Sequence, residues 1–317
     1  MAITLLSPHK QATSGLLAIE WIMVSYCLFT FILAGILWDK IEAAPIINRL
    51  LILTSTLVLW KLYRLRPCLL IYLLRILFQV ALLGYWYPDI YYFAKFMPNT
   101  DHIFAHIDQV IFGCQPAILF RQILSGLWWK ELFNLGYFSY YLMIISIFVW
   151  PLFHSYKWLD YSTCVMVCSF MLFYVIFLFL QSAGPQFYFQ HIGFSLVSEG
   201  KFPEIGNWFL YHSELVHDNS SQGGLFSHLV EIMQEKEKPI AAFPSSHVGL
   251  SSIIILLFWK MSRRMFWIFF PFYVILCLST VYIGAHYAID VLGGWLFAVP
   301  IFYLSSFITN KLLKMAH

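Results

Sequence analysis

The sequence of 317 residues contains few charges, since Asp, Glu, Lys and Arg together make up 11% and apolar residues make up 61%. Soluble domains contain roughly 25% charged and about 45–50% apolar residues, so this composition excludes an ordinary soluble domain. The net charge of +3 is too small to suggest a protein that binds nucleic acid. We therefore expect the lipid bilayer to be the solvent of this chain.

Patterns typical of metal sites and disulfide frameworks are also missing. The six cysteines form no Cys-x-x-Cys pair, and most lie in apolar runs where cysteine packs as a small hydrophobic side chain. No metal and no cofactor are therefore expected. The first apolar run, Trp21 to Trp38, is too long for the core of a signal peptide, so we interpret it as a retained membrane helix.

Long apolar runs predict an all-α polytopic bundle of about eight transmembrane helices. They are expected at 17–38, 46–63, 68–86, 133–154, 161–183, 245–261, 266–286 and 288–310. Two longer polar segments, 87–132 and 184–244, separate some of these runs. In the first segment, Trp128 and Trp129 suit a helix that lies along the membrane surface.

Charged residues divide between the two sides that these spans define. One side contains most of the basic residues, namely Lys10, Lys61, Arg64, Arg66, Lys157, Lys260, Arg263, Arg264, Lys311 and Lys314, and the other contains most of the carboxylates. Basic loops are typical of the cytoplasmic side. We therefore expect both termini to be cytoplasmic and both polar segments to lie on the extracytoplasmic (periplasmic or lumenal) side.

Polar chemistry is concentrated at the start of the sixth span, in AAFPSSHVGLS, Ala241 to Ser251. Proline is tolerated at a helix start, and Ser245 and Ser246 offer hydroxyls beside the unpaired N–H groups of the first turn. Such a helix end favours an anion such as phosphate, and His247 follows directly as a candidate proton donor. Ordinary helix capping with an interfacial histidine remains the alternative interpretation.

A second polar stretch, STVYIGAHYAIDVLGG, joins the seventh and eighth spans. His286 and Asp290 are four residues apart, so on a helix they share a face and can form a hydrogen bond. A carboxylate at Nδ1 fixes the imidazole tautomer and leaves Nε2 free as a nucleophile or base. Because the sixth span runs inward and the seventh returns, His247 and His286 are expected to meet at the outer membrane face.

The combination of PSSH with a later His-x-x-x-Asp resembles the type 2 phosphatidic acid phosphatase superfamily, whose signatures are PSGH and SRxxxxxHxxxD. The resemblance covers about 68–310. It implies that His286 attacks phosphorus, that Asp290 orients His286, and that His247 protonates the leaving oxygen. It also implies that Ser245 and Ser246 bind the phosphoryl oxygens.

The resemblance further implies a division of the chain into two accessory helices, 1–67, and a six-helix catalytic core, 68–317. Two departures from the family pattern stand out. Thr280 replaces the arginine of the last signature, and FLQSAGPQFYF, where the first signature KxxxxxxRP is expected, contains no cation. The pattern that remains, FPSxH with (S/T)xYxxxHYxxD, is similar to the branch that contains inositol phosphorylceramide synthases and sphingomyelin synthases, which pass a lipid headgroup phosphate to an alcohol.

Hydrogen bonds are expected to replace part of the missing cation. The candidates for substrate binding are Thr280, Tyr282 and Gln181, although each is equally compatible with simple interface polarity. Gln186 is a further candidate for such a hydrogen bond. Outer-side cations that could swing in are Lys238, Lys130 and Arg121, and residues that could line the cleft are Asn134, Tyr137 and Tyr141.

Three functions are compatible with these residues. The first is a membrane phosphotransferase that moves phosphate from a lipid phosphate ester through a phosphohistidine to an alcohol such as a polyol. The second is a lipid phosphate phosphatase, whose acceptor is water, and the third is a non-enzymatic transporter. The expected partners are the bilayer, a lipid phosphate substrate and a small alcohol acceptor, with no nucleic acid.

Overall fold

The protein is an almost entirely helical membrane bundle. The computed structural model describes residues 15–213 and 223–316, and within these ranges the only β-type contact is an isolated bridge between Asn99 and Gln181. Seven stretches are long and apolar enough to cross a bilayer. They correspond to α1 (Ala18–Ile36), α2 (Ala43–Leu65), α3 (Leu69–Asp89) continued by α4 (Tyr91–Ala94), α7 (Leu127–His154), α8 (Tyr156–Phe179), α13 (Arg263–Tyr282) and α14 (Ala288–Ala316). The predicted all-α polytopic fold is confirmed.

The sixth predicted span, α12 (Ser246–Met261), is shorter than the others. Its 16 residues cover about 24 Å, less than the roughly 30 Å of a hydrocarbon core. It packs against α7, α8, α13 and α14, so other helices surround most of it. An apolar helix enclosed in this way does not have to match the full membrane thickness, because neighbouring helices replace lipid along its sides.

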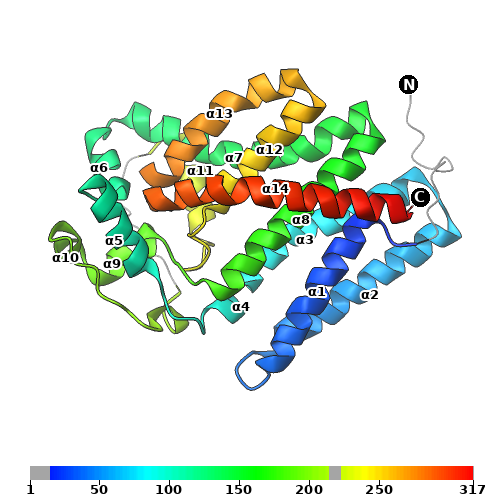
Figure 1. Cartoon of the computed structure of the whole chain (residues 1–317), viewed down its shortest axis with the longest axis horizontal. Helices are drawn as coiled ribbons and strands as arrows, with labels where there is room; N and C mark the ends of the chain where they lie inside the picture. Colours follow the sequence, from blue (N-terminus) through cyan, green and yellow to red (C-terminus); the bar gives the residue numbers. More distant parts are fainter. Residues whose placement is uncertain (1–14, 214–222, 317) are drawn as a thin grey trace.

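The two polar segments fold into short helices. The first contains α5 (Asp101–Phe112) and α6 (Pro116–Ile123), bent by 57° as in a broken span or a re-entrant loop. The second contains α9 (Pro185–Ile192), α10 (Phe194–Ser198), the 3-10 helix η1 (Trp208–Leu210) and α11 (Leu225–Gln234). Figure 1 shows α5, α6, α9 and α10 gathered at one end of the bundle.

The prediction that Trp128 and Trp129 lie on a separate surface helix is wrong. Both residues belong to the first turn of α7, which begins six residues before the predicted span. The helix break falls earlier, at Ser125 and the N-cap Gly126, and no helix breaker follows until well inside the span. The tryptophans therefore mark the outer end of a spanning helix, where aromatic side chains suit the membrane interface.

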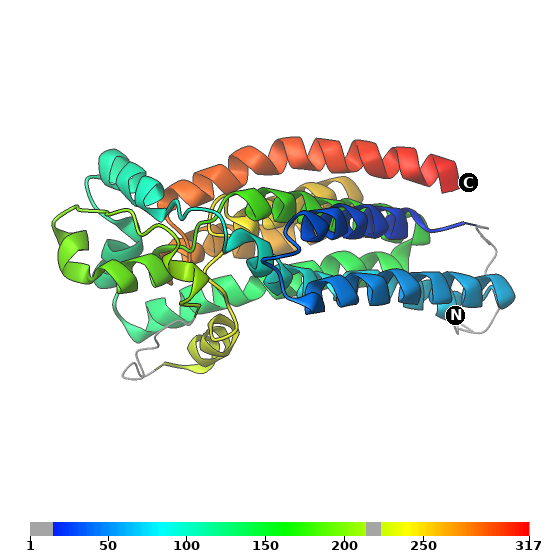
Figure 2. The same cartoon turned by 90° about the horizontal axis from the view of Figure 1, so that it is seen from below.

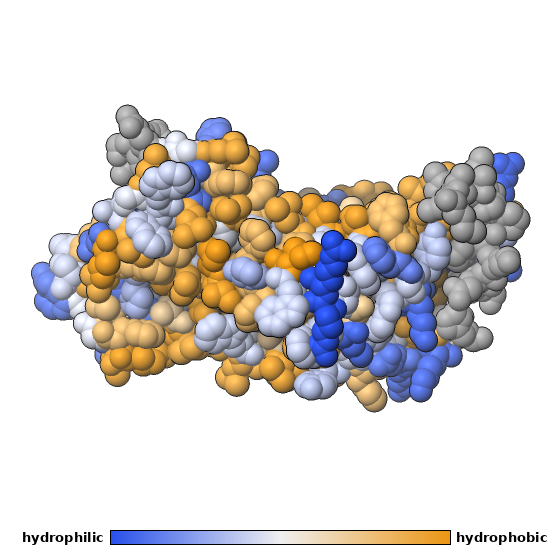
Figure 3. All heavy atoms as spheres, turned by 90° about the horizontal axis from the view of Figure 1, so that it is seen from above, coloured by the Kyte–Doolittle hydropathy of each residue, from blue (hydrophilic) through white to orange (hydrophobic). Residues whose placement is uncertain are grey.

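Two side views of the bundle agree on which ends of the helices lie together. Figure 2 shows the spanning helices aligned with the long axis, with the start of α1 and the end of α14 at the same end. On the face in Figure 3, apolar residues cover much of the left and middle, and hydrophilic residues form a column right of the middle and lie beyond it and at the left end. The short helices of the polar segments thus lie opposite the end of α14.

Two buried ion pairs attach α1 and α2 to α3. Arg49 on α2 forms a two-bond contact with Asp89 at 3.1 Å and 2.6 Å, and Arg75 on α3 donates from Nε to Glu20 on α1 at 2.7 Å. All four side chains are at most 3% exposed. Both pairs cross the boundary expected near residue 67, which stays a prediction.

We expect Arg75→Met to lower the stability of the protein by about 3–5 kcal/mol, because the substitution leaves the Glu20 carboxylate buried without its cation. The double substitution Glu20→Gln with Arg75→Met should recover much of this loss, since it removes both charges. Thermal unfolding in detergent measures both variants. Equal losses in the single and double variants would contradict an ion pair that matters for folding.

Candidate active site

The start of α12 is fixed by contacts with α14. Ser245 is the N-cap: its N–H donates to the backbone oxygen of Asp290 at 3.0 Å, and its Oγ accepts from the N–H of Val248 at 3.4 Å. Gly294 permits this approach, because a Cβ there would lie 2.8 Å from the Ser245 carbonyl oxygen. Pro244 precedes the N-cap rather than occupying the first helical position, so the capping is done by Ser245.

His286 lies in the short loop between α13 and α14 rather than on a helix. Its N–H donates to the carbonyl oxygen of Thr280 at 3.0 Å, and its side chain is almost fully buried. Gly184, at the start of α9, has a φ of +90°, and a Cβ there would lie 2.5 Å from the Ala285 carbonyl oxygen. The α8–α9 turn can therefore press against this loop only with glycine at position 184.

The imidazole of His286 is held by two oxygen acceptors. Nδ1 lies 2.8 Å from the Ala242 carbonyl oxygen and 3.3 Å from Oδ2 of Asp290, which also accepts from the N–H of Tyr287 at 2.9 Å. Because both partners of Nδ1 accept, Nδ1 carries the proton and Nε2 keeps its electron pair. Burial lowers the pKa of His286 to about 4, against weaker opposing effects of Ala242 and Glu237, so the ring is neutral near pH 7.

His247 faces the free nitrogen of His286. The distance from His247 Nδ1 to His286 Nε2 is 3.3 Å, which is within hydrogen-bond range. The rings of Tyr137 and Tyr140, both on α7, lie 4.7 Å and 4.5 Å from the His247 ring and restrict its position. Two histidines and one aspartate from α12, α14 and the loop before α14 thus meet at one end of the bundle.

Glu237 enters the same site from the segment before α12, and the sequence did not indicate it. Its carboxylate accepts from the Tyr137 hydroxyl at 3.1 Å and from Nε2 of Gln186 at 2.7 Å, and Gln186 Oε1 accepts from Gln234 at 2.9 Å. Burial raises the pKa of Glu237, and its charge acts on His286. In the sequence this residue lies in EKEKP, a pattern typical of a solvated surface.

Two further carboxylates hold the loops around the histidines. Asp108 accepts from the N–H groups of Ala288 and Ile289 at 2.8 Å and 2.9 Å, which are unpaired donors of the first turn of α14. Asp101 accepts from the N–H groups of Ala183 and Gly184, both at 2.7 Å. Their signal in the sequence is the presence of acidic residues in an otherwise apolar stretch, DHIFAHIDQVIF.

The predicted substrate-binding residues take different positions. Ser245 and Ser246 lie at the start of α12 beside His247, as expected from their order in the chain. The side chains of the other three donate to backbone oxygens: Thr280 to Cys277 at 3.0 Å, Tyr282 to Leu124 at 2.7 Å, and Gln181 to Pro239 at 3.0 Å. These bonds favour a structural role for the three residues, and their contact with substrate stays a prediction.

The cations that were expected to swing toward the phosphate have other surroundings in the structure. Lys238 donates to Ser213 at 3.2 Å, Lys130 lies 3.8 Å from Glu231, and Arg121 is exposed on α6. Asn134 donates to Ser227 at 3.3 Å, and this bond links α7 to α11. In the described part of the chain, the carboxylates of Asp290 and Glu237, neutral side chains and the backbone N–H groups at the start of α12 therefore surround the histidine pair.

Comparison with known proteins places this chain in a family. A family model described as PAP2 superfamily matches residues 102–304, which run from the start of α5 into α14 and include both histidines and Asp290. No curated protein and no solved structure matches the chain significantly. Members of the superfamily are generally phosphatases or phosphotransferases, and a lipid substrate in the bilayer agrees with the apolar helices. This chain belongs to the PAP2 superfamily.

Proposed function

We propose that the protein is a membrane phosphotransferase that moves phosphate from a lipid phosphate ester to an alcohol through a phosphohistidine at His286. The observation that carries the proposal is the geometry of one imidazole. Nδ1 of His286 donates to Ala242 and lies near Asp290, while Nε2 faces His247. A buried, neutral and oriented imidazole with a second histidine beside it supports nucleophilic catalysis assisted by a general acid.

In the first step, the electron pair on His286 Nε2 forms a bond to phosphorus, and the bond from phosphorus to the lipid oxygen breaks. His247 gives a proton to the departing oxygen. The phosphorylated imidazole is cationic, and the Asp290 carboxylate 3.3 Å from Nδ1 stabilises it. The first-turn N–H groups of α12 and the Ser246 hydroxyl are positioned to bind the phosphoryl oxygens.

Substrate binding has to move His247. A separation of 3.3 Å between His247 Nδ1 and His286 Nε2 leaves no room for a phosphorus atom and its oxygens. The His247 ring, which packs against Tyr137 and Tyr140, must therefore shift away from Nε2 as the phosphate enters. In the second step, His247 takes the proton of the acceptor hydroxyl, whose oxygen bonds to phosphorus as the nitrogen–phosphorus bond breaks.

The polar cluster around Glu237 supports an alcohol as the acceptor. A carboxylate accepts hydrogen bonds from hydroxyls, and an amide both donates and accepts them. Glu237, Gln186, Gln234 and Tyr137 form a connected network of such groups next to the histidines. Water needs no such set of partners. Hydrolysis remains the second candidate, because the same catalytic residues can deliver phosphate to water.

The acceptor is tested by feeding labelled phosphatidic acid to the purified protein with and without a polyol such as inositol. We expect label to move to the polyol and the release of inorganic phosphate to fall. Free phosphate released at an unchanged rate, whatever alcohol is present, would make the protein a phosphatase. If neither product forms and no label stays on the protein, the non-enzymatic alternative is correct.

The same assay tests Glu237. We expect Glu237→Gln to shift the products toward inorganic phosphate, because the amide cannot accept from both Tyr137 and Gln186 as the carboxylate does. Glu235→Gln is the matched control, since Glu235 is an exposed acid two residues away. Equal product ratios in both variants and the wild type would remove Glu237 from acceptor binding.

We also propose that the site faces away from the cytoplasm, because the basic turns of the chain lie at the opposite ends of the spans. Cysteine placed at Lys236, in the segment before α12, should react with an impermeant thiol reagent in intact cells. Cysteine at Arg264, in the first turn of α13, should react only after the membrane is opened. Labelling in the reverse order would place the site on the cytoplasmic side.

A further inference from the structure

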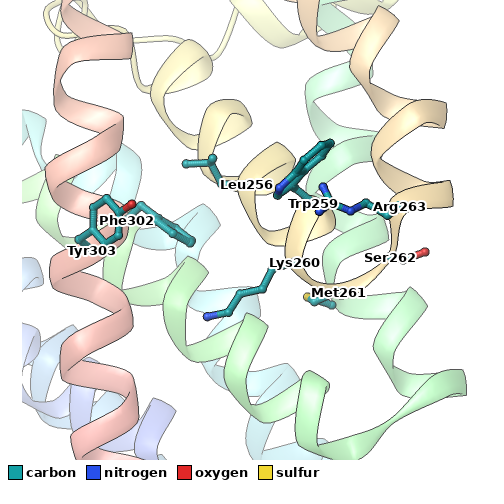
Figure 4. A pocket seen from close by; sticks show the side chains of 8 residues that line it. All are labelled: Leu256, Trp259, Lys260, Met261, Ser262, Arg263, Phe302 and Tyr303. Atoms are coloured by element: carbon teal, nitrogen blue, oxygen red, sulfur yellow. The ribbon is translucent and has the colours of Figure 1, made fainter.

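A second site lies at the end of α12 that is farthest from the histidines. A groove of about 750 Å³ opens there, lined by Leu256, Trp259 and Lys260 of α12, by Arg263 of α13 and by Phe302 and Tyr303 of α14. Figure 4 shows Lys260 extending on the side of Phe302, whereas Arg263 lies against Trp259. The catalytic residues contribute nothing to this groove.

The groove combines two cations with an apolar wall. Lys260 donates to the Tyr161 hydroxyl at 3.0 Å, and the Arg263 guanidinium lies 3.1 Å from the centre of the Trp259 ring. Within residues 15–213 and 223–316, neither cation forms an ion pair with a carboxylate. Asp160, next to Tyr161 in the chain, bonds to Tyr72.

The groove with its two cations lies short of the basic end of α14. The short α12 places Lys260 only about 21 Å along its axis from Ser246. On α14, Tyr303 is eight residues, or about 12 Å, short of Lys311, near the basic end of that helix. The two cations therefore lie short of the basic end of α14, beside its apolar residues.

We propose that this groove binds one anionic phospholipid from the leaflet opposite the active site. The phosphate contacts Lys260 and Arg263, and an acyl chain lies along Leu256 and Phe302. The surroundings favour a lipid over a soluble anion, because the neighbouring exposed side chains of α14 are apolar: Val299, Leu304 and Phe307. A bilayer lipid presents a phosphate and an acyl chain together, whereas free phosphate would contact only the cations and leave the apolar wall uncovered.

The first test compares lipids retained by the purified full chain, with phosphatidylglycerol and phosphatidylcholine as probes and native mass spectrometry as the measurement. We expect the wild type to retain phosphatidylglycerol preferentially. Lys260→Gln with Arg263→Gln should lower its retention about thirtyfold, since each of the two cations near a membrane surface strengthens the attraction about fivefold. Phosphatidylcholine retention should not change.

The matched control is Lys311→Gln with Lys314→Gln, which removes the same charge near the end of α14. Loss of phosphatidylglycerol to the same extent in this control, or equal retention of both lipids by the wild type, overturns the proposal. Thermal unfolding in detergent shows whether each variant is folded.

A second variant tests the groove without removing its charges. Ser262→Cys places a thiol in the α12–α13 turn that lines the groove, and Ser155→Cys places one in the α7–α8 turn. Phosphatidylglycerol vesicles should slow the reaction of a neutral maleimide at position 262 several-fold, and phosphatidylcholine vesicles should not. Equal protection by both lipids, or equal effects at 262 and 155, contradicts a specific site.

Discussion

Replacing His286 with alanine is expected to lower turnover by at least about 10⁴-fold and to abolish labelling of the protein by a lipid phosphate. The side chain is the only group in the described site whose free electron pair and buried, fixed ring suit attack on phosphorus. His286 lies in the loop before α14 and does not contribute to the hydrophobicity of a span. The variant should therefore still insert into the membrane. Initial rates and acid-labile label on the purified protein measure the effect.

Two further variants should lose less turnover than His286→Ala. Ser246→Ala removes one of several groups near the phosphoryl oxygens and should cost far less than His286→Ala. Asp290→Asn should fall between them, because the Ala242 carbonyl, 2.8 Å from Nδ1, still holds the tautomer when the charge that stabilises the phosphohistidine is gone. If His286→Ala retains most of the activity, or Asp290→Asn has no effect, the assigned roles are wrong.

The fold could be predicted because each span is a local property. Apolar runs of sufficient length specify helices one at a time, and all seven long spans lie near their expected positions. The errors occur where local patterns compete. At Trp128 and Trp129, an interfacial composition concealed the start of α7, since a surface helix and the outer end of a spanning helix have similar sequences.

The two stretches that contain the histidines could also be found from the sequence, but their neighbours could not. His286 and Asp290 are close in the chain, although the contact forms because His286 precedes α14 and Asp290 belongs to its first turn. Glu237 reaches Tyr137 across 100 residues, and Asp108 reaches Ala288 across 180. A single sequence contains no local signal for such contacts, because they depend on how distant helices pack.

The role of His247 leads to a different kind of prediction. As the general acid it assists departure of the lipid oxygen, and as the base it activates the acceptor, so His247→Ala should lower turnover about 10²–10⁴-fold with a natural lipid phosphate. With a lipid analogue whose leaving group is a nitrophenolate, the first step needs no acid. His286 should then become phosphorylated normally, while transfer to the acceptor stays slow.

We therefore expect His247→Ala to accumulate a phosphohistidine with the nitrophenyl analogue, seen as acid-labile, base-stable label on the protein after rapid quenching. The wild type should turn over without such accumulation, and the double variant with His286→Ala should show no label. Because His247 Nδ1 lies only 3.3 Å from His286 Nε2, His247 could also act by merely positioning His286. The comparison of the two substrates distinguishes these roles, since a merely structural His247 would impair both steps alike. Equal losses with natural and activated substrates, without label on the protein, would reduce His247 to a residue that only positions His286.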